Sequence, residues 1–243
     1  YRVLRIVEAR IARVADRVLV RTPAAIDTLL ARTQWKTDRS KYHVVCNGRD
    51  PRPYQSDEPV RNDENFRLCY AGSVGEQYCP DRIVATAILL KEKIPQLVFR
   101  VFTGDGPALR AALDRASVGD RSWIELSRLP PEAMPDALMA CDLAIAYRKP
   151  AFSTKGVSPI KLGEYMLAGL PVIGTPGVGL SEPLIDQGVF LPITDDLSPI
   201  WPWVRDNVIA DRESMRSKAN QLGVSYFSLE RAVGSYVSAL ADE

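Results

Sequence analysis

Beyond residue 65, short apolar runs alternate strictly with segments of helical periodicity, and this alternation constrains the fold more than any other feature of the sequence. Such an order is typical of βαβ units, in which consecutive strands lie parallel and helices cover both faces of the sheet. The predicted strands are Phe66–Tyr70, Leu97–Phe102, Trp123–Leu126, Leu143–Tyr147, Pro171–Thr175 and Val189–Leu191. The predicted helices between them are Asp81–Lys93, Ala108–Ala116, Pro131–Ala140, Pro159–Ala168 and Ser181–Asp186. The sequence therefore predicts an α/β domain built on a parallel sheet.

Glycines follow several of the predicted strands, at the sheet edge where ligands of such folds bind. Gly72 follows the first strand, and Gly104-Asp105-Gly106 follows the second. Glycines between a strand and a helix suit the close approach of a phosphate, and they also suit any tight turn. The third glycine of the GxGxxG fingerprint is missing, which argues against a dinucleotide-binding dehydrogenase.

Residues 151–175 are predicted to form a loop, a helix and a buried strand. Ser158 can cap the helix with its hydroxyl, and Pro159 suits the first helical position, where a missing N–H costs nothing. Gly169 suits the left-handed residue that often comes after a last helical turn. The stretch therefore presents a helix N-terminus to the sheet edge, and helix N-termini can bind phosphate.

Two charged side chains of this helix are candidates for ligand binding. Glu164 points back toward the N-terminus because helical Cβ atoms tilt that way, so its carboxylate can accept hydrogen bonds from sugar hydroxyls beside a phosphate. Lys161 places a cation in the first turn, where the helix dipole disfavours it. This position indicates an anionic partner, or else Lys161 lies on a solvated face; the sequence leaves both interpretations open.

Composition narrows the class of protein. The chain has 243 residues, 46% of them hydrophobic and 25% charged, with a net charge of +1. These values are typical of a soluble globular protein and exclude a general attraction to nucleic acid. No run of about 18 apolar residues and no signal peptide is present. The four cysteines lack metal-ligand spacing, which predicts reduced thiols and a cytoplasmic protein. With His43 as the single histidine and no GxSxG, a His-rich metal site is excluded and a serine hydrolase disfavoured.

The first 50 residues differ from the rest of the chain. An amphipathic helix over residues 2–16 carries a basic face, which is solvated or touches anionic lipid. Two short strands, Val18–Val20 and Tyr42–Cys46, flank a second helix over Pro23–Arg32, too few elements to close a sheet. Their apolar faces would stay in water unless they docked on something. We therefore expect a missing domain or a neighbouring chain to cover them, and the start at Tyr1 to mark an incomplete product.

The sequence of residues 151–175 resembles the nucleotide-sugar site of GT-B glycosyltransferases, in particular the retaining family numbered four. Members carry two glutamates with seven residues between them, followed by a Gly-x-Pro and a strand. Glu164 matches the second glutamate, and Gly169 and Pro171 match the Gly-x-Pro. The run from Ser158 to Met166 is similar to a variant seen in polysaccharide-building members. Gly156 stands where the first glutamate, which contacts the transferred sugar, is expected.

Other loops are similar to the same family. Gly72-Ser73 matches the first loop of its C-terminal domain, which usually carries an arginine and then a lysine for the diphosphate. Here Ser73 departs from that pattern, and Arg148, Lys149 and Lys155 either supply the charge or are surface cations. In the family, the loop at Ser127-Arg128-Leu129 meets the nucleobase through its main chain. Gly177–Glu182 matches the glycine loop over the phosphates, or is a flexible loop capped by Ser181.

The resemblance implies a Rossmann-like parallel sheet that binds a nucleotide sugar and passes the sugar to a glycan or lipid-linked acceptor, with no metal or cofactor. It implies four regions: 1–50 as the remnant of an acceptor-side domain, 51–65 as a linker, 66–225 as the donor-binding domain and 226–243 as a helix returning to the first. The implied donor-binding residues are Gly72, Ser73, Gly104, Gly106, Arg128, Leu129, Ser158, Pro159, Ile160, Lys161 and Glu164. Catalytic residues stay unassigned.

The two departures from the family motifs support a second hypothesis. Gly156 in place of a glutamate and Ser73 in place of a basic residue are compatible with a binding or interaction module of the same fold that has lost catalysis. The two hypotheses differ in whether the protein transfers a sugar.

Overall fold

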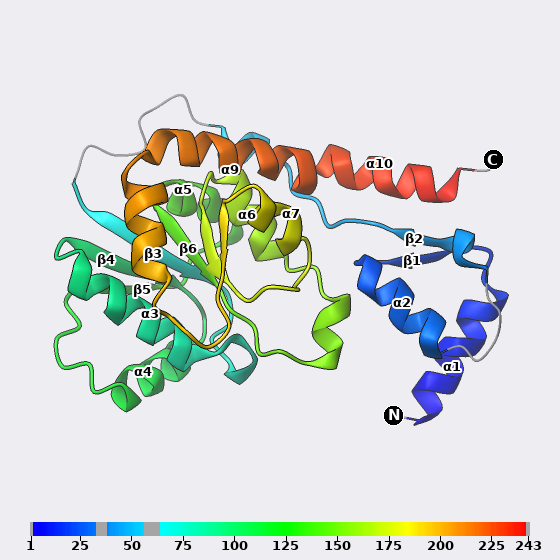
Figure 1. Ribbon diagram of the computed structural model, residues 1–243, viewed down its shortest axis with the longest axis horizontal. Coiled ribbons are helices and arrows are strands. Elements are labelled where there is room, and N and C mark those ends of the chain that lie inside the picture. Colours follow the sequence, from blue (N-terminus) through cyan, green and yellow to red (C-terminus); the bar gives the residue numbers. More distant parts are fainter. Residues whose placement is uncertain (1, 33–37, 56–63, 242–243) are drawn as a thin grey trace.

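A computed structural model of the chain describes residues 2–32, 38–55 and 64–241 (Figure 1). Six parallel strands form one sheet, in the order β5-β4-β3-β6-β7-β8. These strands are β3 (Phe66–Ala71), β4 (Leu97–Phe102), β5 (Ile124–Ser127), β6 (Leu143–Ala146), β7 (Val172–Gly174) and β8 (Phe190–Pro192). The chain runs outward from β3 to β5 and then returns to place β6 beside β3, so the strand order reverses between these two strands. The predicted Rossmann-like parallel sheet is confirmed.

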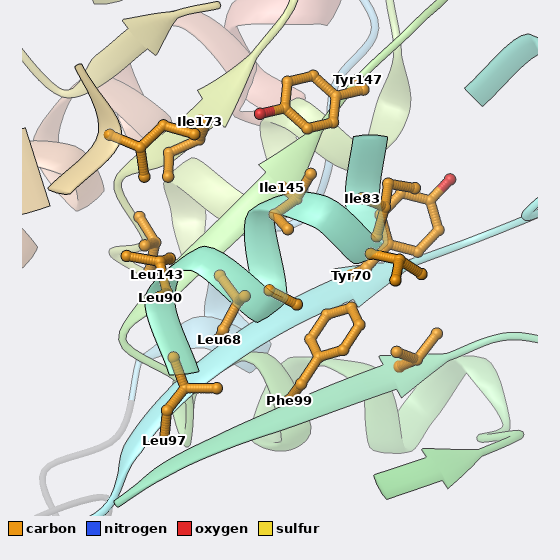
Figure 2. Close-up of a cluster of buried hydrophobic side chains, with 14 of the residues drawn as sticks. Leu68, Tyr70, Ile83, Leu90, Leu97, Phe99, Leu143, Ile145, Tyr147 and Ile173 are labelled. Atoms are coloured by element: carbon orange, nitrogen blue, oxygen red, sulfur yellow. The ribbon is translucent and has the colours of Figure 1, made fainter. Parts of the chain in front are cut away.

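Helices cover both faces of this sheet, because alternate residues of each strand point to opposite sides. Phe66, Leu68 and Tyr70 of β3 belong to one buried cluster, and Cys69 and Ala71 belong to another. Figure 2 shows the first cluster, where side chains of β3, β4 and β6 pack against α3. The helices of the sheet domain are α3 (Pro80–Lys93), α4 (Gly106–Arg115), α5 (Met134–Met139), α6 (Ile160–Leu167), α7 (Ser181–Asp186), α8 (Ile200–Trp203) and α9 (Arg212–Phe227).

Helix α6 differs from its prediction at the N-terminus and agrees at the C-terminus. Pro159 is the capping residue, and no side chain caps the helix, so the predicted Ser158 hydroxyl cap is wrong. The Leu162 N–H instead bonds the Pro159 carbonyl at 3.2 Å. At the other end Gly169 has φ +72°, and the Leu170 N–H reaches the Tyr165 carbonyl at 2.8 Å, the pattern of a Schellman cap.

The N-terminal residues form a separate parallel pair of strands, β1 (Val18–Val20) and β2 (Tyr42–Val44), with helices α1 (Arg2–Val14) and α2 (Pro23–Arg32). Of the apolar residues in the two predicted strands, Val20 and Val45 are buried within the chain, at 8% and 2% exposed, whereas Leu19 and Val44 are 37% and 36% exposed. Helix α10 (Leu229–Leu240) runs toward this pair of strands in Figure 1. There the Cys46 N–H contacts the Ser235 hydroxyl at 3.3 Å.

The segment after β2 forms hydrogen bonds with the last residue of α9 and the first residue of α10. The Arg49 N–H bonds the Phe227 carbonyl at 2.8 Å, and the Leu229 N–H bonds the Arg49 carbonyl at 2.7 Å. Gly48 lies so close to α10 that an added Cβ would be 2.6 Å from the Ala232 side chain. In the described parts of the chain, no helix is both long and apolar enough to cross a bilayer.

Two helical glycines provide a matched test of this packing. A Cβ on Gly223 of α9 would lie 2.6 Å from backbone atoms of Leu167 and Met166 in α6, whereas a Cβ on Gly234 of α10 would meet nothing within 4 Å. We expect Gly223→Ala to lower the free energy of unfolding by about 1–3 kcal/mol through overpacking. Gly234→Ala should raise it by up to about 1 kcal/mol, because alanine favours the helix.

Urea unfolding of both variants measures these changes. Equal effects of the two substitutions would contradict the close approach of α9 to α6.

Candidate functional site

A cavity of about 430 Å³ lies at the carboxyl ends of β3, β4 and β5. Ligands of open parallel sheets bind at this edge, near the point where the strand order reverses. The cavity joins loops that are far apart in the sequence, and five of the predicted donor-binding residues line it: Gly72, Ser73, Gly104, Arg128 and Leu129. Its other lining residues are Phe102, Thr103, Asp105 and Met134.

The loop after β3 fixes the entrance of this cavity. Gly72 has φ +115°, a conformation that L side chains rarely adopt, and its N–H bonds the Phe102 carbonyl at 2.9 Å. The Ser73 hydroxyl donates to the Asp105 carboxylate at 2.7 Å, which links this loop to the one after β4. Apolar side chains and polar backbone groups thus share one hollow, which is typical of small-molecule sites.

Lys161 does not lie on a solvated face, so that interpretation of the sequence is wrong. Its ammonium nitrogen lies 3.0 Å from the Tyr70 hydroxyl, and 4.3 Å and 4.5 Å from the ring centroids of Tyr70 and Tyr78. It also lies 3.1 Å from the point that a Cβ on Gly72 would occupy. The first turn of α6 therefore places a cation next to the loop after β3.

Burial lowers the pKa of Lys161 from 10.5 to about 7, with a further contribution from nearby Arg148 and a partly offsetting one from Glu164. Burial also raises the pKa of the Tyr70 hydroxyl, so Tyr70 stays protonated beside the lysine. Lys161 is therefore a group whose charge changes near neutral pH.

Arg148 follows β6 and is the second cation beside Tyr78, next to Lys161. Its guanidinium carbon lies 5.5 Å from the Tyr78 ring centroid, and its main-chain N–H bonds the Thr175 hydroxyl at 3.0 Å. Its Nε is buried, and no described residue accepts a hydrogen bond from it. The prediction left open whether Arg148 is a ligand or a surface cation, and the residue is half-buried at this sheet edge.

Glu164 does not have a free carboxylate, because its Oε1 accepts a hydrogen bond from the Nε of Arg49 at 2.9 Å. Sequence reasoning did not single out Arg49. Asn47-Gly48-Arg49-Asp50 has the composition of a turn, and this composition does not show which helix the turn contacts. Asn47 of the same turn donates to the Ser158 carbonyl at 2.8 Å. A ligand that uses Glu164 must therefore share it with Arg49 or displace Arg49.

The remaining predicted site residues lie outside the lining of the cavity. Gly106 is buried, and an added Cβ would lie 3.2 Å from Leu126 and 3.3 Å from Arg110, so a side chain here would require both neighbours to shift slightly. Pro159 and Ile160 line a small pocket beside Asn47–Arg49 at the start of α6. Lys161 lines a separate small pocket with Tyr78 and Arg148, and its ammonium nitrogen reaches Gly72, which lines the larger cavity.

The predicted glycine loop before α7 is held by a serine. The Ser181 hydroxyl accepts hydrogen bonds from the N–H groups of Gly177 at 3.0 Å and Val178 at 3.3 Å. Gly179 has φ +66°, and an added Cβ would lie 2.8 Å from Pro159. Both interpretations of this loop stay open, since a serine-held loop can also cover a ligand.

A second, larger groove of about 640 Å³ lies between α10 and the segment after β2. Its lining is mostly apolar and includes Val233, Val237 and Leu240, with Arg21 as its cation. It lies away from the carboxyl edge of the six-stranded sheet and gathers no set of groups suited to chemistry. Within the described ranges, no group of three His, Cys, Asp or Glu side chains is placed to hold a metal ion.

No protein-family model and no curated protein matches this chain. Solved structures do. HepE of Anabaena, in complex with UDP-glucose, aligns with 97% of this chain at a TM-score of 0.74 and 16% identity. WaaG, a glycosyltransferase involved in lipopolysaccharide biosynthesis, aligns with 93% of it at 0.71 and 16% identity. The chain has the GT-B fold. Sucrose-phosphate synthase of Thermosynechococcus elongatus aligns with 96% of the chain at 0.70 and 16% identity.

These GT-B structures are longer than this chain. The chain spans 66% of HepE, 63% of WaaG and 60% of sucrose-phosphate synthase. The likeness extends over both the six-stranded sheet and the N-terminal strand pair, because nearly all of the chain takes part in each alignment.

The half-buried Lys161 gives a stability test that needs no ligand. With a folded-state pKa of about 7 and an ordinary value of 10.5, Lys161 binds fewer protons in the folded state between these values. Its contribution to the free energy of unfolding therefore rises with pH above 7, by up to about 1.4 kcal/mol per pH unit. We expect the difference between wild type and Lys161→Met to rise in this way between pH 7 and 9 in urea unfolding.

Lys149→Met is the matched control, because Lys149 is exposed and paired with Glu76 at 2.7 Å. The pKa of Lys149 is raised by that pair, so its charge does not change in this range. Parallel stability curves for wild type and Lys161→Met would show that Lys161 is charged in the folded protein.

Proposed function

We propose that this chain is the donor-binding part of a glycosyltransferase, which moves a sugar from a nucleotide-sugar donor to a glycan or lipid-linked acceptor with retention of configuration. The observation that carries the proposal is the cavity at the carboxyl ends of β3–β5, with Lys161 beside its entrance. HepE, of the same fold, was crystallised with UDP-glucose and with UDP.

The cavity suits the parts of such a donor. Phe102, Leu129 and Met134 offer apolar contacts for a nucleobase, and the main chain at Arg128 offers polar groups. Gly72 leaves room for a phosphate to approach the backbone, and Lys161 supplies a cation there. Glu164 can accept hydrogen bonds from a ribose once Arg49 shares or releases its carboxylate.

The second candidate function is a nucleotide-sugar-binding module that has lost catalysis. Gly156 at the position of the first family glutamate and the Arg49–Glu164 ion pair favour it. An activity measurement on the full-length protein distinguishes the two functions. Turnover of a nucleotide sugar that Glu164→Ala abolishes would exclude the inactive module, whereas tight donor binding without any turnover would exclude the enzyme.

We also propose that residues 1–50 are part of a second domain, joined by the linker 51–65 to the donor-binding domain, with 226–243 returning to the first. Six large apolar side chains of α1 face solvent: Val3, Leu4, Ile6, Val7, Ile11 and Val14. Contiguous apolar surface of this kind marks an interface. We propose that further protein of an acceptor-side domain covers this apolar surface of α1.

Sedimentation equilibrium of this chain tests the competing idea that a neighbouring chain covers α1. That idea predicts a dimer, and Ile11→Lys should disrupt it.

Isothermal titration of UDP, GDP, ADP and TDP against the chain tests the donor site. We expect one of them to bind, and Lys161→Ala to weaken its binding about 10- to 100-fold, the usual effect of losing a charge-assisted hydrogen bond. Lys149→Ala removes an equal charge from an exposed position and should change the affinity little. If none of the four nucleotides binds while the circular dichroism spectrum shows an intact fold, the proposed function is wrong.

A further inference from the structure

Two cations meet where the strand order of the sheet reverses. Arg148 follows β6, Lys161 lies in the first turn of α6, and the Tyr78 ring contacts both, 5.5 Å from the guanidinium carbon and 4.5 Å from the ammonium nitrogen. Neither cation belongs to any ion pair among the residues that the structure describes, although most of their charged neighbours do. Like charges held this close are unfavourable unless an anion lies between them.

No carboxylate in the described surroundings neutralises this pair. The titratable groups that face Lys161 are Tyr70 of β3, Tyr78, Arg148 and, on its own helix, Glu164. Glu164 is bonded to Arg49. Farther away, Asp105 accepts from Ser73, Glu76 pairs with Lys149, and the pKa of the half-buried Cys79 thiol is raised by burial, which keeps that thiol neutral.

A guanidinium does not lose its proton in proteins, so the lysine must relieve the repulsion. Burial and the charge of Arg148 bring the pKa of Lys161 to about 7. The Nε–H of Arg148 is buried, and no described residue accepts a hydrogen bond from it. Buried donors normally have an acceptor, so this group lacks a partner that a ligand can provide. An oxyanion placed between the two side chains would satisfy that donor and favour the charged lysine.

We propose that Arg148 and Lys161 form one phosphate site, in which Lys161 is a neutral amine when the site is empty and takes up a proton from solvent when the donor diphosphate enters. This inference rests on the proposed function and adds Arg148 to its binding residues. The amine nitrogen gains one N–H bond, and no bond of the nucleotide changes. Above pH 7, donor affinity should therefore fall with rising pH, by up to about tenfold per pH unit.

Calorimetric titration of UDP-glucose in buffers of different ionisation enthalpy measures the protons taken up. The diphosphate of this probe has no group that titrates near pH 7, so any uptake belongs to the protein; the matching GDP, ADP or TDP sugar replaces it if that nucleotide binds instead. We expect close to one proton per bound donor at pH 8 and close to none at pH 6.

Three variants test whether Lys161 is the group that takes up the proton when the donor binds. Lys161→Arg keeps a permanent cation and should bind the donor at pH 8 without proton uptake. Arg148→Gln should reduce both the affinity and the uptake at pH 8, because Lys161 then keeps more of its charge in the empty site. Lys149→Gln is the control and should change neither, since Lys149 is exposed and paired with Glu76.

Binding of UDP-glucose at pH 8 with no proton uptake would overturn this inference and leave the proposed function standing. Failure of every nucleotide sugar to bind would overturn both.

A carbon-13 titration of the lysine side chains in the wild-type protein gives the same answer without variants. One lysine should titrate near pH 7 in the free protein and well above pH 8 with UDP-glucose bound, and a lysine that stays charged through pH 9 in the free protein would contradict the proposal.

Discussion

The position of α6 is the constraint on which the rest of the site depends. This helix is held between the sheet and α9, which comes so close that only a glycine fits at position 223. Toward the sheet, the Ala71 N–H at the end of β3 bonds the Tyr165 hydroxyl at 2.7 Å. At the C-terminal end of α6, Arg216 of α9 donates to the carbonyls of Cys141 and Ala168, which ties the helix to the loop before β6. The helix can therefore neither rotate nor slide without losing buried contacts.

The place of Lys161 depends on that fixed helix. Residues four positions apart share one face of a helix, so Lys161 lies over the same strand end that Tyr165 contacts. There it meets Tyr70 and Tyr78, and burial changes its chemistry from that of an ordinary surface lysine. In the proposed function, Lys161 of α6 takes the role of the cation that GT-B enzymes resembling this chain place on the loop after the first strand of the sheet.

The sheet was predictable because its signal is local. Apolar runs and helical periodicity placed the strands and most helices to within a few residues, and Gly169 marked a helix end that depends on one left-handed residue. The Ser158 cap failed, because serine favours a cap only where the backbone turns to suit it, and here Pro159 takes that position. A Cβ on Gly106 would come close to Leu126 and Arg110, and no sequence motif reveals these neighbours.

The parts of the site that escaped sequence reasoning are contacts between distant segments. Arg49 and Glu164 are 115 residues apart, and Lys161 is 91 residues from Tyr70. A spacing pattern shows which groups share one helix or one loop, but the packing of the whole sheet decides which loops meet. The burial of Lys161 and the missing acceptor for Arg148 are therefore visible only in three dimensions.

The proposed function requires the donor to bind at the carboxyl ends of β3–β5, next to the point where the strand order reverses. Amide chemical shifts of the isotope-labelled chain during titration with UDP-glucose test it most directly. We expect the largest changes at Gly72, Ser73, Gly104 and Leu129, together with the first turn of α6. Changes confined to the apolar groove at Cys46, Val233 and Tyr236 would contradict it.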